Sequence, residues 1–367
     1  ASDARLYGPA LTACETRAPC VFSAHAQHWP GGLDFEALMA RPETAAVQTA
    51  YESIAPDTHA KYLLTSGSTG TPKVVINTHR MLCANQQMMA QAWRFLAHEK
   101  PVLVDWLPWN HTFGGNHNFG LTMMHGGTLY IDDGKPTAAM IGETLRNLRE
   151  IAPTVFTAVP RVWEKFYSGV MIALKESTRM QQAAYAWSIG VGTRIADRVL
   201  AGQPVGGLLK AQFMLARFLA LNNVRKLIGI HRARFLVTGA APISPELVKW
   251  YLALGVPMLE VWGMTETCGA STGVPASRIK PGSIGPAASY NEVKLDPTTG
   301  EMVLPASLGD NPSLREATMA GDPINMGNWI ALIALIVLGQ AAAWTLVQYG
   351  SVWLDPTLSA GILLLSP

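Results

Sequence analysis

The chain has 367 residues, of which 49% are hydrophobic and 15% are charged, and its formal net charge is +2. This composition is sufficient for a sizeable core in about two or three domains, and it argues against disorder. Because the charge is nearly balanced and no long run of Lys or Arg occurs, the sequence does not support a nucleic-acid-binding surface, and we expect small-molecule partners.

The cysteines and the N-terminal residues bear on the cellular compartment of the protein. Cys14, Cys20, Cys83 and Cys268 form no C-x-x-C pair, and we expect free thiols in a reducing environment. The chain begins without a basic stretch followed by an apolar one, so no signal peptide is expected. We expect a cytoplasmic location.

The first segment, residues 1–60, is rich in Ala, Pro and mixed polar residues with weak periodicity. Up to residue 58 this pattern predicts loops and short helices. We interpret 1–60 as a partial N-terminal segment, and little function can be placed there.

From residue 61 to residue 304, short apolar runs alternate with helical patterns, which predicts a layered α/β domain. The expected strands lie near 61–65, 73–77, 102–107, 128–132, 154–158, 233–238 and 257–262. The expected helices lie near 79–97, 138–151, 160–174 and 244–254. Residues 176–228 carry almost no strand pattern, and they predict a helical insertion.

The tail, residues 305–367, contains a long apolar segment. Residues 323–354 have no charged side chain, and 329–349 is long and apolar enough to span a bilayer. A membrane contact through 329–349 is therefore one interpretation. A buried helix of a soluble domain is the other.

One loop has the composition of a phosphate-binding site. Between Thr65 and Lys73 the chain reads T-S-G-S-T-G-T-P-K and follows a strand-like segment. Glycines leave backbone N–H groups accessible to an anion, hydroxyls add neutral donors, and Lys73 supplies a positive charge. The spacing is not that of the P-loop, and composition alone leaves an ordinary turn equally open.

Two further strands end in chemically useful residues. Trp262-Gly263-Met264-Thr265-Glu266 follows the apolar run 257–261, and ligands of α/β folds often bind at such strand ends. Thr265 could donate to a phosphate, and Glu266 could hold Mg²⁺. The run Thr238-Gly239-Ala240-Ala241-Pro242 leaves space for a flat ring. Each segment alone is also compatible with an ordinary turn.

Taken together and in chain order, the three segments resemble the adenylate-forming superfamily of acyl- and aryl-CoA synthetases. The loop 65–73 is similar to its phosphate loop, 238–242 to its adenine-side segment, 262–266 to its aromatic-G-x-T-E signature and 282–285 to its G-S-x-G turn. The finer resemblance of 77–85 and 109–115 is to bacterial feruloyl-CoA synthases.

The resemblance implies ATP-dependent activation of an aromatic, hydroxycinnamate-like carboxylate and its transfer to coenzyme A, with Mg²⁺ as the metal. It implies catalytic roles for Lys73, His111, Thr265 and Glu266, with Glu266 as the metal ligand. The implied nucleotide-binding residues are Thr65, Ser66, Gly67, Ser68, Thr69, Gly70, Lys73, Gly239, Ala240, Ala241, Pro242, Trp262, Gly263, Met264 and Thr265. His111 lies where the family places a residue beside the carboxylate pocket.

The tail departs from the family pattern. The family continues with a ribose-binding aspartate and a small C-terminal lid domain that carries an adenylating lysine, and residues 305–367 match neither. We therefore expect weak activity or none from this chain. The alternative to an acid–CoA ligase is a non-catalytic nucleotide-binding or membrane-tethered remnant, or a chimera, of such an enzyme.

Overall fold

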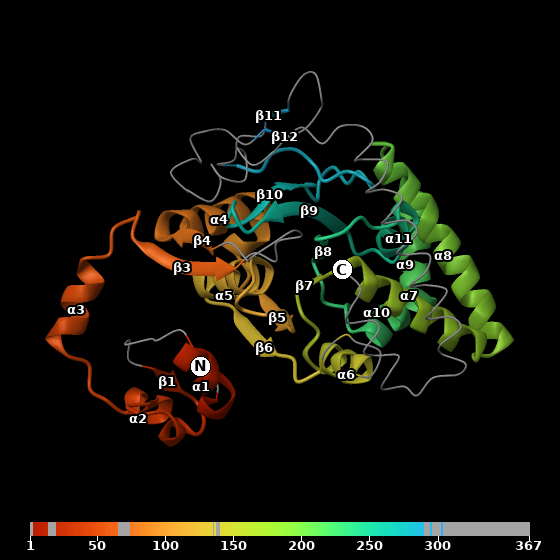
Figure 1. Cartoon of the computed structure of the whole chain (residues 1–367). Helices are drawn as coiled ribbons and strands as arrows, with labels where there is room; N and C mark the ends of the chain where they lie inside the picture. Colours follow the sequence, from red (N-terminus) through yellow and green to blue (C-terminus); the bar gives the residue numbers. More distant parts are fainter. Residues whose placement is uncertain are drawn as a thin grey trace, which may run out of the picture. The chain divides into compact units, whose positions relative to one another are not determined.

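The computed structural model describes residues 3–13, 20–64, 74–134, 136, 140–289, 294–295 and 302–303. These residues belong to two units, residues 1–58 and residues 59–367. Figure 1 labels most of the helices and strands of both units.

The smaller unit consists of short elements, as the weak periodicity predicts. Its elements are α1 Ala4–Ala13, β1 Val21–Phe22, the 3-10 helix η1 Ala26–His28, β2 Leu33–Asp34, α2 Phe35–Met39 and α3 Ala45–Glu52. Strands β1 and β2 are parallel, and Ala4, Phe22 and Ala26 form a small core under Trp29. A cluster of this size stabilises only a limited unit.

The larger unit is built on a four-stranded sheet in the order β10-β9-β8-β7. Strands β7 Val155–Ala158, β8 Phe235–Thr238 and β9 Met258–Met264 are parallel, and β10 Gly269–Gly273 is antiparallel to β9. Every residue of β7 and β8 is buried. Continuous apolar strands of this kind are typical of parallel sheets that are covered on both faces.

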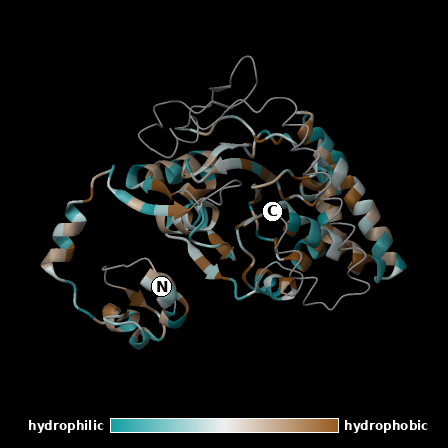
Figure 2. Ribbon diagram, viewed as in Figure 1, coloured by the Kyte–Doolittle hydropathy of each residue, from teal (hydrophilic) through white to brown (hydrophobic). Residues whose placement is uncertain are grey.

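Helical crossovers join the parallel strands, as parallel pairing requires. The first crossover contains α7 Pro160–Lys175, α8 Arg179–Leu200, α9 Gly207–Ala216, the π-helix η4 Arg217–Leu221 and α10 Asn222–Ile228, and the second is α11 Pro245–Ala253. Residues 176–228 are therefore the helical insertion that the sequence predicts. In Figure 2, α8 alternates hydrophilic and hydrophobic positions, as expected for a helix with one packed face.

The remaining elements lie before this sheet in the chain, except for the short strands β11 and β12, which follow it. The antiparallel hairpin β3 His59–Leu64 and β4 Val74–Thr78 leads into α4 His79–Ala92 and the 3-10 helix η2 Arg94–Ala97. Strand β5 Val102–Asp105 pairs in parallel with β6 Thr128–Ile131, and between them lie the π-helix η3 Thr112–Asn118 and α5 Phe119–His125. Helix α6 Ile141–Ile151 follows β6, and β11 Lys294–Leu295 pairs with β12 Met302–Val303.

The layered α/β fold is confirmed, and two boundaries need correction. The helix predicted over 79–97 ends at Ala92, because Trp93 leaves helical geometry and its ring packs 4.7 Å from that of Phe235. The strand predicted to end near Trp262 continues to Met264, because β10 pairs with that extension in a hairpin.

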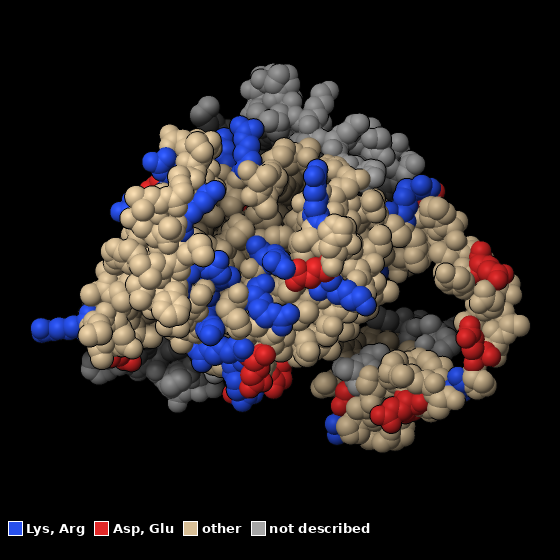
Figure 3. Space-filling model, turned by 180° about the vertical axis from the view of Figure 1, so that it is seen from behind, with Lys and Arg blue, Asp and Glu red and all other residues tan. Residues whose placement is uncertain are grey.

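Charge is unevenly distributed over the larger unit. Figure 3 shows its reverse face, on which Lys and Arg side chains gather and acidic side chains are fewer. In the described part of the chain, no helix combines the length and the apolarity needed to cross a bilayer. The predicted apolar helix 329–349 lies outside the described residues, as does the rest of the tail.

Candidate functional site

The predicted phosphate loop connects two paired strands. Residues 65–73, including Lys73, lie outside the described residues, but β3 and β4 on either side of them are described. Leu64 pairs with Val74, so the two ends of the loop lie next to each other on paired strands. The next turn is also fixed locally, because the backbone N–H of Met81 donates to Thr78 Oγ1 at 3.4 Å and caps α4.

The Thr-Glu pair of the predicted signature lies in the turn between β9 and β10. Thr267 holds this turn: its Oγ1 accepts from the N–H of Met264 at 3.2 Å and lies 2.9 Å from Gly269 O. Cys268 has a φ of 65°, which is unusual for a residue other than glycine. Thr265 and Glu266 are partly exposed at the tip of this ordered hairpin.

Glycine at position 263 is required by the hairpin geometry. A Cβ at Gly263 would overlap the carbonyl oxygen of Gly269 on the paired strand. Trp262, Gly263 and Met264 therefore belong to the paired strand, whereas the sequence predicted that the strand ends near Trp262. Only Thr265 and Glu266 lie beyond the strand end.

The small residues after β8 lie beside the same strand. A Cβ at Gly239 would approach Val261 O to 2.8 Å, so glycine permits the close contact between β8 and β9. Ala240 has a φ of 68°, while Ala240, Ala241 and Pro242 are exposed. The end of β8 and the signature strand are thus direct neighbours, which agrees with the sequence-based grouping of these segments.

A buried polar cluster connects the phosphate-loop hairpin with the signature turn. Asn116 in η3 is its centre and is 1% exposed. Asn116 Nδ2 donates to Asn77 Oδ1 on β4 at 2.9 Å and to Cys268 O in the signature turn at 3.1 Å. Asn77 Nδ2 in turn lies 3.4 Å from Thr265 O. Buried amides that satisfy one another in this way fix the relative positions of their segments.

Lys61 adds a positive charge to this cluster. Its Nζ donates to Asn116 Oδ1 at 3.0 Å, and burial lowers the pKa of Lys61. Gln86 of α4 donates to Asn116 O at 2.5 Å. Burial also raises the pKa of the neighbouring Cys268 thiol to about 12, so this cysteine is a neutral packing residue.

His111 is exposed at the start of the π-helix. Its Nδ1 accepts from the N–H of Phe113 at 3.2 Å, which caps η3. The two following glycines permit a tight approach, since a Cβ at Gly114 would lie 2.5 Å from Pro108 O. The carboxylate of Asp105, at the end of β5, accepts hydrogen bonds from Trp109 Nε1 and Asn118 Nδ2, each at 2.8 Å. π-Helices are rare and occur frequently at functional sites.

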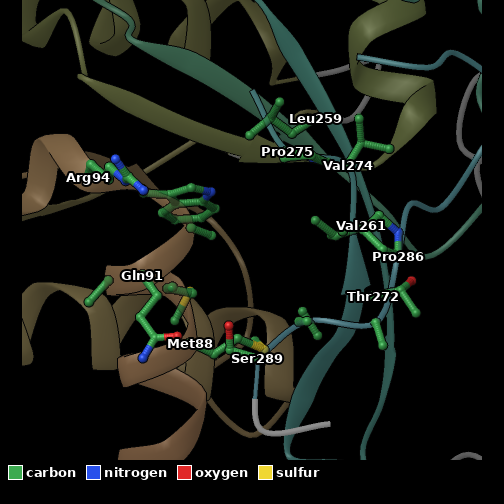
Figure 4. Close-up of a pocket in the computed structure, with 18 of the residues that line it drawn as sticks. Met88, Gln91, Arg94, Leu259, Val261, Thr272, Val274, Pro275, Pro286 and Ser289 are labelled. Carbon is green, nitrogen blue, oxygen red and sulfur yellow. The ribbon is translucent and has the colours of Figure 1, made fainter. Parts of the chain in front are cut away.

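A pocket of about 750 Å³ lies between α4 and the sheet. Figure 4 shows Met88, Gln91 and Arg94 on one side, with Leu259, Val261, Thr272 and Val274 across the space. None of the sequence-predicted site residues that the structure describes lines it. The pocket adjoins the predicted site through β9, because Val261 lines the pocket and its carbonyl faces Gly239.

His117 lines this pocket from the π-helix and is 4% exposed. Burial lowers the pKa of His117 to about 4, so the ring is neutral at pH 7. Its Nδ1 lies 2.8 Å from Asn118 Oδ1, and its ring packs 5.5 Å from that of Trp93. A neutral, ring-lined wall of this kind suits an apolar ligand.

Sequence reasoning missed the residues that connect the site. Asn77, Asn116, Lys61, Gln86 and His117 were not among the expected site residues. The one available signal was the run of polar side chains and glycines at 110–118, which is unusual beside apolar strands. Nothing in that run indicates that Asn116 would meet Cys268, 152 positions further along the chain.

Glu266 is suited to a metal shared with phosphate groups. Among the described residues, no three His, Cys, Asp or Glu side chains gather closely enough to hold a metal ion by themselves. In the same residues, the Glu266 side chain makes no hydrogen bond or ion pair, so its carboxylate is available. Mg²⁺ is commonly bound by one or two carboxylates together with substrate phosphates, and one available glutamate fits that pattern.

Comparison with known proteins defines the class. Residues 14–310 match the family model described as AMP-binding enzyme, so the chain belongs to the AMP-binding enzyme family. It is 32% identical over 223 residues to the long-chain-fatty-acid–CoA ligase ACSBG2 of Gallus gallus. It is 28% identical over 277 residues to fadD11 of Mycobacterium tuberculosis, which is named provisionally as a fatty-acid–CoA ligase.

These matches cover 60% and 74% of this chain but 28% and 46% of the two relatives, so the chain spans less than half the length of either. Among solved structures, o-succinylbenzoate coenzyme A synthetase (MenE) from Bacillus subtilis in complex with AMP matches at 18% identity with a TM-score of 0.49. That match covers 81% of this chain and 50% of the other.

Proposed function

We propose that this chain carries the carboxylate-activating site of an ATP-dependent acid–CoA ligase. In the first half-reaction, a carboxylate oxygen forms a bond to the α-phosphorus of ATP, the bond to pyrophosphate breaks, and an acyl-adenylate results. In the second, the thiol sulfur of coenzyme A attacks the acyl carbonyl, its proton passes to solvent, and AMP leaves. Membership of the AMP-binding enzyme family supports this assignment.

One contact supports the proposal most directly. The hydrogen bond from Asn77 to Thr265 O joins the strand that follows the phosphate loop to the turn that carries Glu266. Activation of a carboxylate by ATP requires hydrogen-bond donors and a metal ligand close to each other at the phosphates, because negative charge increases on the phosphate oxygens during the reaction. Asn116 stabilises the same juxtaposition from a third segment.

We assign the roles as follows. Thr265 contacts the α-phosphate, Glu266 binds Mg²⁺, and His111 lies beside the reacting carboxylate. The residues assigned to the β- and γ-phosphates are Ser66, Ser68, Thr69, Gly70 and Lys73. Gly239, Ala240 and Ala241 line the adenine side. When bound, Mg²⁺ would neutralise phosphate charge and favour the departure of pyrophosphate.

The pocket beside β9 favours an acid with an apolar tail. Its walls include Met88, Met89, Trp93, Leu259 and Val261, and about 750 Å³ is enough for a medium or long acyl chain. The names of the two relatives point in the same direction. We therefore propose a fatty acid as the first candidate substrate.

A hydroxycinnamate is the second candidate. The segments 77–85 and 109–115 favour it, because they resemble feruloyl-CoA synthases. The aromatic rings of Trp93 and His117 at the pocket wall could stack with a phenyl group. The two acids differ in shape, so a substrate series distinguishes them.

The test is carboxylate-dependent pyrophosphate release by the purified chain with ATP and Mg²⁺. Because residues 305–367 do not match the lid domain of the family, we expect slow release with decanoate or palmitate and less with ferulate. Release with ferulate alone would support the hydroxycinnamate candidate. No release with any acid, together with saturable ATP binding, would support the remnant alternative and contradict the proposed ligase activity.

A further inference from the structure

The outer face of α9 and η4 exposes large apolar side chains to solvent. Leu208 is 77% exposed, Met214 73% and Phe218 79%, with Leu215 and Leu219 beside them at 50% and 44%. On the opposite side of the same helix, Ala216, Ala220 and Leu221 are buried. A helix that is apolar on its solvent side as well as its packed side usually has a further partner.

These residues share one face. Leu208, Leu215 and Phe218 follow at spacings of seven and three, which bring side chains together along a helix. Met214 and Leu219 widen the stripe. We call these five residues, Leu208, Met214, Leu215, Phe218 and Leu219, the α9–η4 face.

The helical segments α9 and η4, which carry this face, contain basic residues and no acidic one. Between Asp197 and Glu246 the sequence contains no acidic residue but seven basic ones, which are Arg198, Lys210, Arg217, Arg225, Lys226, Arg232 and Arg234. Lys210 and Arg217 lie on the same helix as the apolar stripe and are exposed. Within the described residues, no carboxylate pairs with Lys210, Arg217 or Lys226.

An apolar groove opens at the edge of the face. It measures about 320 Å³ and lies between α7, α8 and the η4–α10 segment. Leu219 belongs to both the groove and the α9–η4 face, while Leu174, Tyr185 and Leu227 form other walls. Such a groove could take up an acyl chain, in continuity with the exposed stripe.

We propose that the α9–η4 face binds an anionic lipid surface. Leu208, Met214 and Phe218 enter the boundary between headgroups and acyl chains, and Lys210 and Arg217 contact lipid phosphates. Charge disfavours a second copy of this chain as the occupant, because two such faces would bring like charges together. The proposal does not depend on the proposed ligase reaction.

The test is flotation of the full 367-residue chain with vesicles. One set contains phosphatidylcholine alone, and the other contains equal parts of phosphatidylcholine and phosphatidylglycerol. We expect binding to the anionic vesicles, weakened by added salt because surface attraction is screened. Phe218→Glu should weaken this binding by roughly tenfold or more, since it removes a large apolar contact. Each of Lys210→Gln and Arg217→Gln should weaken it about fivefold.

The matched control is Met123→Glu, which places the same charge at a residue on α5 that is 68% exposed. It should bind as the unsubstituted chain does, and circular dichroism should show that all variants are folded. Equal binding by Phe218→Glu and the unsubstituted chain would overturn the proposal. Equal binding to vesicles with and without anionic lipid would also overturn it. So would lipid-free dimerisation that Phe218→Glu abolishes, because the face would then be an interface between copies.

Discussion

Asn116 contacts three segments that are distant in the sequence, and its side chain uses both its donor and its acceptor groups. Removing it leaves Asn77 Oδ1 and Cys268 O without this partner in a buried place, and it leaves the half-buried Lys61 Nζ without it as well. Each unsatisfied buried group costs about 1–3 kcal/mol. The amide is thus a large local determinant of the arrangement of the site.

We predict that Asn116→Ala lowers the free energy of unfolding by roughly 2–4 kcal/mol, measured by chemical denaturation. Asn223→Ala is the matched control, because Asn223 is exposed on α10, and it should change stability by less than about 0.5 kcal/mol. Equal stability of the two variants would show that the cluster does not hold the segments together.

We expect the Glu266 carboxylate to bind a metal ion and not to stabilise the fold. Glu266→Ala should slow ATP–pyrophosphate exchange by a factor that corresponds to about 2–4 kcal/mol, because one electrostatic stabiliser is lost. Folding stability should be almost unchanged, since the side chain has no partner among the described residues. Glu176→Ala, at an exposed helix end, is the control. Unchanged exchange in Glu266→Ala would refute the metal-binding role.

His117 makes stability sensitive to acid. Its pKa is about 4 in the folded chain against 6.5 for an ordinary histidine, so between these values the unfolded chain binds more protons. The contribution of His117 to stability is therefore complete above pH 6.5 and falls as the pH decreases towards 4. The difference amounts to about 3 kcal/mol over that range.

The measurement is chemical denaturation of the unsubstituted chain and of His117→Gln at several pH values. Glutamine cannot gain a charge, so the unsubstituted chain should lose stability more steeply between pH 6.5 and pH 4. Parallel pH profiles would contradict a buried neutral imidazole at this position.

At the scale of elements, strand β9 joins the signature turn, the pocket and the G-S-x-G turn. Glu260 on β9 accepts a hydrogen bond from the N–H of Gly282 at 3.0 Å, and burial raises the pKa of its carboxyl group.

Glu260→Ala should lower the free energy of unfolding by about 1–3 kcal/mol. Glu260→Gln keeps an acceptor without the buried charge, so it should cost less. Hydrogen exchange at the Gly282 amide measures the effect, and equal protection in both variants would argue against this contact.

Elements with a strong local pattern could be predicted from the sequence. Strands β5 to β9 were expected within a few residues, because each is an apolar run with turn-forming neighbours. Strand β10 was missed because its sequence, Gly-Ala-Ser-Thr-Gly, carries no apolar alternation and depends on pairing with β9. The π-helix η3 was missed because its geometry depends on contacts with Leu107 and Pro108.

The sequence predicted the separate segments of the candidate site but not the long-range contacts that join them. Thr265 and Glu266 lie at a strand end and Gly239 beside β9, as the ordered segments suggested. The Asn77–Thr265 contact spans 188 positions, and a single sequence contains no record of such a pair. The pocket behind β9 likewise arises from five separate segments, which lie within 88–98, at 117, and within 259–261, 270–275 and 286–289.

At the scale of the whole molecule, the larger unit combines two regions of different chemistry. One is the polar junction of the β3–β4 hairpin, η3 and the β9–β10 turn, and the other is the apolar α9–η4 face with its basic neighbours. Substitutions on the helical insertion should leave nucleotide binding unchanged, because α9 and η4 contribute no side chain to that junction. Measuring the ATP affinity of Phe218→Glu checks this independence, and a large loss of affinity would show that the two regions are coupled.

The most direct measurement is isothermal titration of the full chain with a non-hydrolysable acyl-adenylate analogue that carries a fatty acyl group. We predict saturable binding at one site and competition by ATP. When ATP and Mg²⁺ are titrated instead, Glu266→Ala should bind them more weakly than the unsubstituted chain does. Absence of binding by the folded chain, or binding that ATP does not displace, would contradict a carboxylate-activating site.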